Sequence, residues 1–138
     1  MSQNITTAES KLVTASGHQK LAVKLTALEP LTEGAPLTLW LSISENKEYP
    51  LLYRHAWGSA HVSTREDGAD SFPIETLRLR IEMPGLTGPI VDDQTRQNSA
   101  DCPADCKFAG TIAGDFTSRW DAWATHPGYG TWSSGNNW

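Results

Sequence analysis

The fold class is decided by one stretch, Leu37-Thr38-Leu39-Trp40-Leu41-Ser42-Ile43-Ser44. Its leucines and isoleucine recur at every second position, and the residues between them are polar except for Trp40. Side chains alternate between the two faces of a β-strand. The stretch therefore predicts a half-buried strand whose apolar row faces a core, with Trp40 on the opposite face.

The same alternation recurs at residues 21–27 and 77–82. Weaker strand patterns lie at 12–15, 49–54, 61–64 and 108–112, and turn-forming glycine, proline and aspartate separate many of these segments. No long segment has the period of an amphipathic helix. We therefore expect a mainly-β protein, an antiparallel β-sandwich of immunoglobulin-like or jelly-roll-like type.

Two segments break this pattern. Residues 85–105 are rich in proline, glycine and polar side chains, which predicts a long irregular loop. Asp115 is placed to cap a short helical turn over residues 116–125, in which Phe116, Trp120 and Trp123 would share one stripe. We expect a flexible arm at 1–10 and one sandwich domain at 11–138, with an aromatic C-terminal segment at 115–138.

Residues 19–68 resemble many immunoglobulin-like accessory and inhibitor sandwiches. The resemblance consists of the alternating runs at 21–25 and 36–43, followed by Asn46, Pro50-Leu51 and Asp67-Gly68. It covers about a third of the chain and implies a sandwich fold without a functional motif.

Charge and hydropathy exclude several classes of function. The net charge is -5, and the excess of acidic residues lies entirely in residues 61–138. Nucleic-acid binding needs a basic surface, so we expect no nucleic-acid partner. No apolar run approaches the ~18 residues of a membrane-spanning helix. The N-terminus lacks the pattern of a signal peptide, so we expect synthesis in the cytosol, with export by another route left open.

Aromatic residues are concentrated near the C-terminus, where residues 120–138 contain four of the six tryptophans. Indole rings beside asparagine and serine favour a sugar-binding face, although the same rings could pack on the domain or on a partner subunit. The candidate ligand-binding residues are Trp40, Trp57, Tyr129, Trp132, Asn136, Asn137 and Trp138.

Histidines and acidic residues raise a second hypothesis, a small metal-dependent enzyme. His55 and His61 flank Trp57-Gly58, and with His126 they could bind a divalent metal ion if the chain bends at Gly58. Asp92 and Asp93 are candidate ligands in the predicted loop. The sequence contains no His-Glu-x-x-His motif and no phosphate-binding glycine loop. Surface histidines and a solvated loop explain the same residues without a metal.

Cys102 and Cys106 are the only cysteines, and they are either a disulfide pair or two free thiols. Taken together, these patterns favour a non-catalytic recognition module that binds carbohydrate, without a cofactor. The first alternative is a protein-binding or assembly subunit, including a protease-inhibitor-like sandwich or a homo-oligomer. The second is the metal-dependent enzyme.

Overall fold

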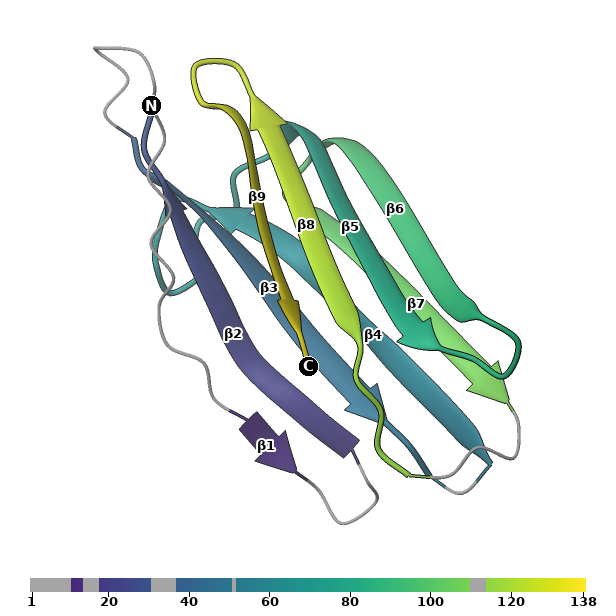
Figure 1. Cartoon of the computed structure of the whole chain (residues 1–138). Coiled ribbons are helices and arrows are strands. Elements are labelled where there is room, and N and C mark those ends of the chain that lie inside the picture. Colours follow the sequence, from purple (N-terminus) through teal and green to yellow (C-terminus); the bar gives the residue numbers. More distant parts are fainter. Residues whose placement is uncertain (1–10, 14–17, 31–36, 51, 110–113) are drawn as a thin grey trace.

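In the computed structural model, two antiparallel sheets pack face to face in a β-sandwich, as Figure 1 shows. The structure describes residues 11–13, 18–30, 37–50, 52–109 and 114–138. All regular elements in these ranges are strands. The prediction of an antiparallel sandwich is therefore confirmed, whereas the predicted arm at 1–10 lies outside the described residues.

The first sheet has the strand order β1-β2-β3-β4-β7. Its strands are β1 (Lys11–Val13), β2 (His18–Leu28), β3 (Leu39–Glu48), β4 (Tyr53–Ser63) and β7 (Asp101–Ala109). The second sheet has the order β6-β5-β8-β9. Its strands are β6 (Pro89–Ser99), β5 (Ile74–Pro84), β8 (Arg119–His126) and β9 (Gly130–Asn137).

The core lies between the sheets and is built from alternate residues of the central strands. Leu39, Leu41 and Ile43 of β3 are fully buried, as are Leu77, Leu79 and Ile81 of β5. Trp40 is half-buried on the other face of β3, as its place in the alternation predicts. Burying these rows is the main driving force for packing the two sheets together.

The predicted loop at 85–105 is wrong, because most of it belongs to β6 and β7. β6 is an edge strand with mostly polar side chains, so it lacks the apolar row that identifies a strand in the sequence. In β7 the buried row is short and made of small residues, Cys102, Ala104 and Cys106. Proline at strand starts and edges is compatible with a sheet, so Pro89 and Pro103 do not interrupt these strands.

The predicted helical turn at 116–125 is also wrong, since β8 occupies Arg119–His126. Trp120, Ala122 and Ala124 are fully buried, which is the period of a strand. Trp123 is half-buried on the outer face, where the Arg78 guanidinium lies 4.2 Å from its ring centroid. The backbone of β8 pairs with β5 on one side and with β9 on the other. This pairing stabilises a strand more than the helical spacing of the aromatic rings would stabilise a helix.

The sheets approach each other most closely along β6 and β7, which lie together at one side of the sandwich in Figure 1. The Asp105 backbone N–H of β7 donates to Asp92 Oδ2 of β6 at 2.7 Å, and the Cys102 thiol donates to the Gln94 carbonyl at 3.3 Å. These contacts place side chains of β6 beside the edge of the first sheet. In the described part of the chain, no helix is long and apolar enough to cross a membrane.

Candidate functional site

The outer face of the first sheet gathers several of the candidate residues. In β4, Ala56 and Ala60 point into the core, so the alternate residues His55, Trp57 and His61 lie on the outer face. Trp57 is paired with Asp105 of β7 in the sheet register. Side chains of directly opposed residues lie on the same face, so Trp57 and Asp105 are neighbours there.

A groove with a volume of about 380 Å³ lies at this point, where β4 and β7 meet β6. We call it the Trp57 groove, and it is lined by Trp57, Gly58, Asp92, Gln94, Arg96, Pro103, Ala104 and Asp105. The sequence predicted Trp57 as a ligand-binding residue and Asp92 as a metal ligand. The structure brings these two together in one groove.

The polar wall of the groove comes from alternate residues of β6. Asp92, Gln94 and Arg96 are paired in register with the buried residues Ile81, Leu79 and Leu77 of β5. They therefore lie on the core side of the second sheet. Because β6 is the edge strand, this polar row faces the edge of the first sheet rather than the core.

Hydrogen bonds hold the carboxylates of the groove in place. Asp92 Oδ2 accepts the Asp105 N–H at 2.7 Å, and Asp92 Oδ1 accepts the Gln94 amide at 2.6 Å. Asp105 Oδ1 lies 2.9 Å from His55 Nε2. The His55 ring stacks on the Trp57 indole with centroids 4.2 Å apart and planes inclined by 24°.

The three histidines of the metal hypothesis are not brought together. His61 Nδ1 lies 2.7 Å from Asp101 Oδ1, and its Nε2 lies 2.9 Å from the Gly68 carbonyl. His126 belongs to the second sheet, where its Nδ1 accepts the backbone N–H of Glu75 at 3.2 Å. Among the described residues, no three histidine, cysteine, aspartate or glutamate side chains form a metal-binding group.

The two adjacent aspartates of β6 point in opposite directions. Asp92 faces the Trp57 groove, whereas Asp93 lies on the outer face and accepts two hydrogen bonds from Arg78, at 2.8 and 2.6 Å. Hydrogen bonds from Arg78 hold the pKa of Asp93 below its ordinary value. Adjacent residues of a strand face opposite sides of the sheet, so the side chains of Asp92 and Asp93 do not converge on one position.

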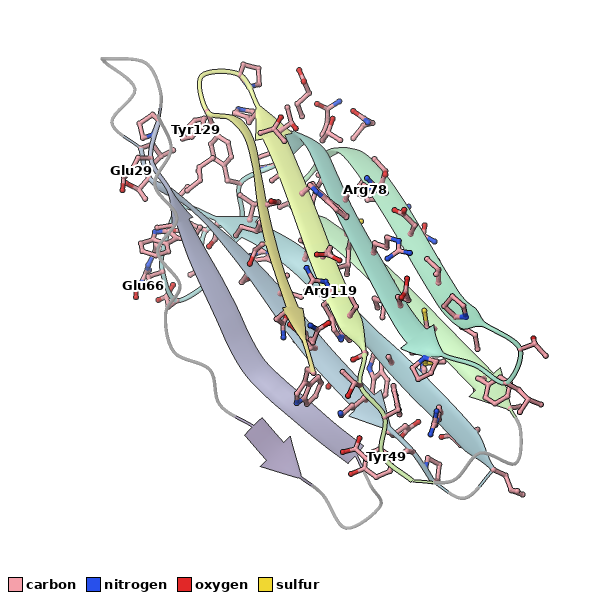
Figure 2. The ribbon with its side chains drawn as sticks, in the orientation of Figure 1. Glu29, Tyr49, Glu66, Arg78, Arg119 and Tyr129 are labelled. Carbon is pink, nitrogen blue, oxygen red and sulfur yellow. The ribbon has the colours of Figure 1, made fainter. Side chains whose placement is uncertain are left out.

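The C-terminal candidate residues do not share a face with Trp40 and Trp57. Tyr129 is buried, its hydroxyl donates to the Leu37 carbonyl at 2.5 Å, and burial raises its pKa. Figure 2 shows Tyr129 and Tyr49 at opposite ends of the sandwich. The Asn136 amide donates to Glu45 Oε1 at 3.2 Å. The Trp132 side chain lies outside the described side chains.

Trp138 and Asn137 lie at the end of the sandwich opposite Tyr129. Two neighbouring hollows of about 550 and 420 Å³ occupy this end, and Asn137 and Thr117 line both of them. The smaller hollow contains Trp138 and the nearly buried Lys47, whose ammonium lies 4.9 Å from the Trp138 ring centroid. That ammonium is satisfied by the Phe116 carbonyl at 2.8 Å and by a carboxylate oxygen of Asp115 at 3.0 Å.

Cys102 and Cys106 are both buried and free. They lie on the same face of β7, four residues apart, so their Cα atoms are roughly 13 Å from each other, far beyond disulfide reach. Desolvation raises both pKa values, that of Cys106 to about 11. The disulfide alternative is therefore wrong, and the two cysteines are free thiols.

The groove is also lined by Arg96 and Pro103, which sequence reasoning did not identify as functional. One sequence pattern could have identified this wall of the groove. It is the alternation of Asp92, Gln94 and Arg96, which places three polar side chains on one face of a strand. Comparisons with protein-family models, with curated proteins and with solved structures found no match to this chain. The site therefore has to be interpreted from its own geometry.

Proposed function

We propose that this protein is a non-catalytic carbohydrate-recognition module and that the Trp57 groove is its ligand site. One observation carries the proposal: an indole ring and the side chains of Asp92, Gln94, Arg96 and Asp105 line one open groove. Small-molecule sites typically combine an aromatic wall with a few placed polar groups.

The chemistry of these side chains matches that of a sugar ring. A pyranose has apolar C–H patches on its faces, which can pack against an indole, and hydroxyl groups around its edge. Each hydroxyl is both a donor and an acceptor. Asp92 and Asp105 can accept hydrogen bonds from hydroxyl groups, Arg96 can donate them, and Gln94 can do both. The volume of about 380 Å³ is near the lower end of the usual range of ligand sites, which suits one or two sugar units.

The contacts around the groove hold its side chains in place, which also favours ligand recognition. Asp92 is fixed by two hydrogen bonds from neutral donors, and Trp57 is stacked on His55. A preformed site loses less conformational entropy when a ligand binds. The groove residues therefore need little rearrangement to bind a rigid sugar ring.

Calorimetric titration with soluble hexasaccharides tests this proposal, with cello-, xylo-, manno-, malto- and chito-oligosaccharides as the probes. We expect one class to bind, and Trp57→Ala to weaken it at least about tenfold, since stacking is lost. Trp40→Ala is the matched control, because Trp40 lies on the same outer face but does not line the groove. Binding to no probe, or equal losses in the two variants, would rule out the Trp57 groove as a glycan site.

A protein partner is the second candidate, and a different surface favours it. The larger end hollow is lined by Met83, Pro84 and Pro89, and Leu86 in the adjoining hairpin is 69% exposed. The hollow also has polar lining residues, among them Glu82 and Arg119, and an apolar patch with a polar rim is typical of interaction surfaces. Sedimentation velocity over a hundredfold range of concentration tests self-association here. Leu86→Lys should abolish any dependence of the sedimentation coefficient on protein concentration. A wild-type protein that stays monomeric over the whole range would contradict self-association through this surface.

A further inference from the structure

We propose that His55 is a positioning residue that fixes two walls of the Trp57 groove and makes ligand affinity depend on pH. This inference rests on the proposed carbohydrate function. His55 itself does not line the groove, but it contacts two residues that do, Trp57 and Asp105. It can therefore change binding only through these neighbours.

The imidazole of His55 lies between two carboxylates. Its Nδ1 is 3.2 Å from Glu48 Oε1 on β3, and its Nε2 is 2.9 Å from Asp105 Oδ1 on β7. The His55 side chain is 17% exposed, whereas that of Asp105 is 61% exposed, so the ring is largely covered and its carboxylate partner on β7 faces solvent. The His55 ring on β4 thus connects β3 and β7, the strands on either side of β4.

The protonation state of the ring decides how many of these contacts are hydrogen bonds. A neutral imidazole has one N–H, whereas an imidazolium has two. Both neighbouring atoms here are acceptors, so only the imidazolium donates to both Glu48 and Asp105. In the neutral ring, one nitrogen lone pair faces a carboxylate oxygen, and that contact becomes repulsive.

Other charged and titratable groups surround the ring on each strand that packs against it. Tyr53 of β4 donates its hydroxyl to the same Glu48 oxygen at 2.6 Å. Lys107 of β7 is paired with His55 in the register, and its ammonium lies 5.2 Å from the Tyr53 ring centroid. Glu48 and Asp105 attract an imidazolium, and Lys107 repels it.

The direction of the pH effect follows from these contacts. The imidazolium holds Asp105 at a fixed position in the groove, with its second oxygen left to face a ligand. It also keeps the ring in place beneath Trp57. The neutral ring releases one carboxylate, so the groove is less ordered and binding is weaker. Affinity should therefore be higher at acidic than at alkaline pH.

Affinity measurements at about pH 5.5 and about pH 8 test the inference, using whichever hexasaccharide of the panel binds the wild-type protein. We expect roughly fivefold weaker binding at the higher pH, because one charged hydrogen bond is lost. His55→Gln and His55→Phe should each remove the pH dependence. Two variants are used because a ring without donors could impair folding, whereas the glutamine keeps polar atoms at this position.

His61→Phe is the matched control. His61 lies on the same face of β4 and is also placed between two acceptors, Asp101 and the Gly68 carbonyl. Neither His61 nor these two partners line the groove. Its variant should keep the wild-type pH dependence. An affinity that does not change with pH in the wild type, or a pH effect that disappears in His61→Phe, would overturn the role of His55.

A second readout needs no ligand and separates this inference from the proposed function. A protonated imidazole quenches the fluorescence of an indole stacked on it, and His55 is stacked on Trp57 at 4.2 Å. Wild-type emission should therefore rise with pH, and both His55→Phe and Trp57→Phe should lose that rise. If no hexasaccharide binds, the proposed function fails, while this fluorescence rise still supports the positioning of Trp57 by His55. An identical pH response in wild type and His55→Phe contradicts it.

Discussion

The indole of Trp120 packs directly against Gly58 across the sandwich. A Cβ atom at position 58 would lie 3.0 Å from Trp120 Cζ3 and would overlap the Ser44 carbonyl oxygen. Trp120 is fully buried and is the largest side chain of the core. The absence of a side chain at Gly58 is thus what allows the largest core residue to fit between the sheets.

Gly58→Ala should therefore destabilise the protein, by about 3 kcal/mol, because the added methyl group meets backbone that cannot move freely. Urea unfolding followed by circular dichroism measures the change. Ser59→Ala, on the adjacent outward position of β4, should change stability by less than about 0.5 kcal/mol. Equal stability of Gly58→Ala and the wild type would mean that the backbone of β3 at Ser44 and the Trp120 ring shift at little cost.

Ser118 connects Trp120 to the C-terminal strand. Its hydroxyl donates to the Trp138 carbonyl at 2.7 Å and accepts the Trp120 Nε1–H at 2.7 Å, and the residue is fully buried. Ser118→Ala should cost about 2 kcal/mol in the free energy of unfolding, because a buried indole N–H loses its acceptor. The exposed Ser133→Ala is the control. A loss no larger than that of the control would show that water replaces the hydroxyl.

The strands that could be predicted are those with a large apolar row. The leucines and isoleucine of β3, and the similar row of β5, identify half-buried strands because period-two burial leaves a clear pattern in the sequence. β6 leaves no such pattern, since its core-side residues, Asp92, Gln94 and Arg96, line a groove instead of packing in the core. The polar row that makes β6 a candidate binding surface is the same feature that hides it as a strand.

The candidate site depends on pairing across long stretches of sequence. Trp57 was among the aromatic residues predicted to bind a ligand, but Asp105 becomes its neighbour only through the register of β4 and β7. In and just before β8, the spacing of Phe116, Trp120 and Trp123 fits a helix. The burial of Trp120, Ala122 and Ala124 fits a strand instead. Tertiary pairing decides between these periods, and local sequence does not record it.

The Cys106 thiol should resist alkylation in the folded protein. Burial raises its pKa from 9.0 to about 11, so little reactive thiolate is present at pH 8. Because the folded pKa is the higher one, stability is intact below pH 9.0 and falls as pH rises from there to about 11. Mass spectrometry after iodoacetamide treatment, with and without urea, measures the protection. Cys106→Ala should flatten the alkaline loss of stability, and rapid labelling of native Cys106 would contradict its burial.

The Arg78–Asp93 pair on the outer face should show the opposite dependence on pH. Figure 2 shows Arg78 on the second sheet, where its two hydrogen bonds lower the Asp93 pKa below 3.8. The pair therefore contributes stability above that pH, and this contribution is lost as pH falls through the lowered value. Asp93→Asn should cost less than about 1 kcal/mol at neutral pH, since the pair is partly exposed.

NMR titration of the Asp93 carboxyl carbon measures the pKa directly. In Arg78→Met it should return to the ordinary value, and an unchanged pKa there would show that Arg78 is not its cause.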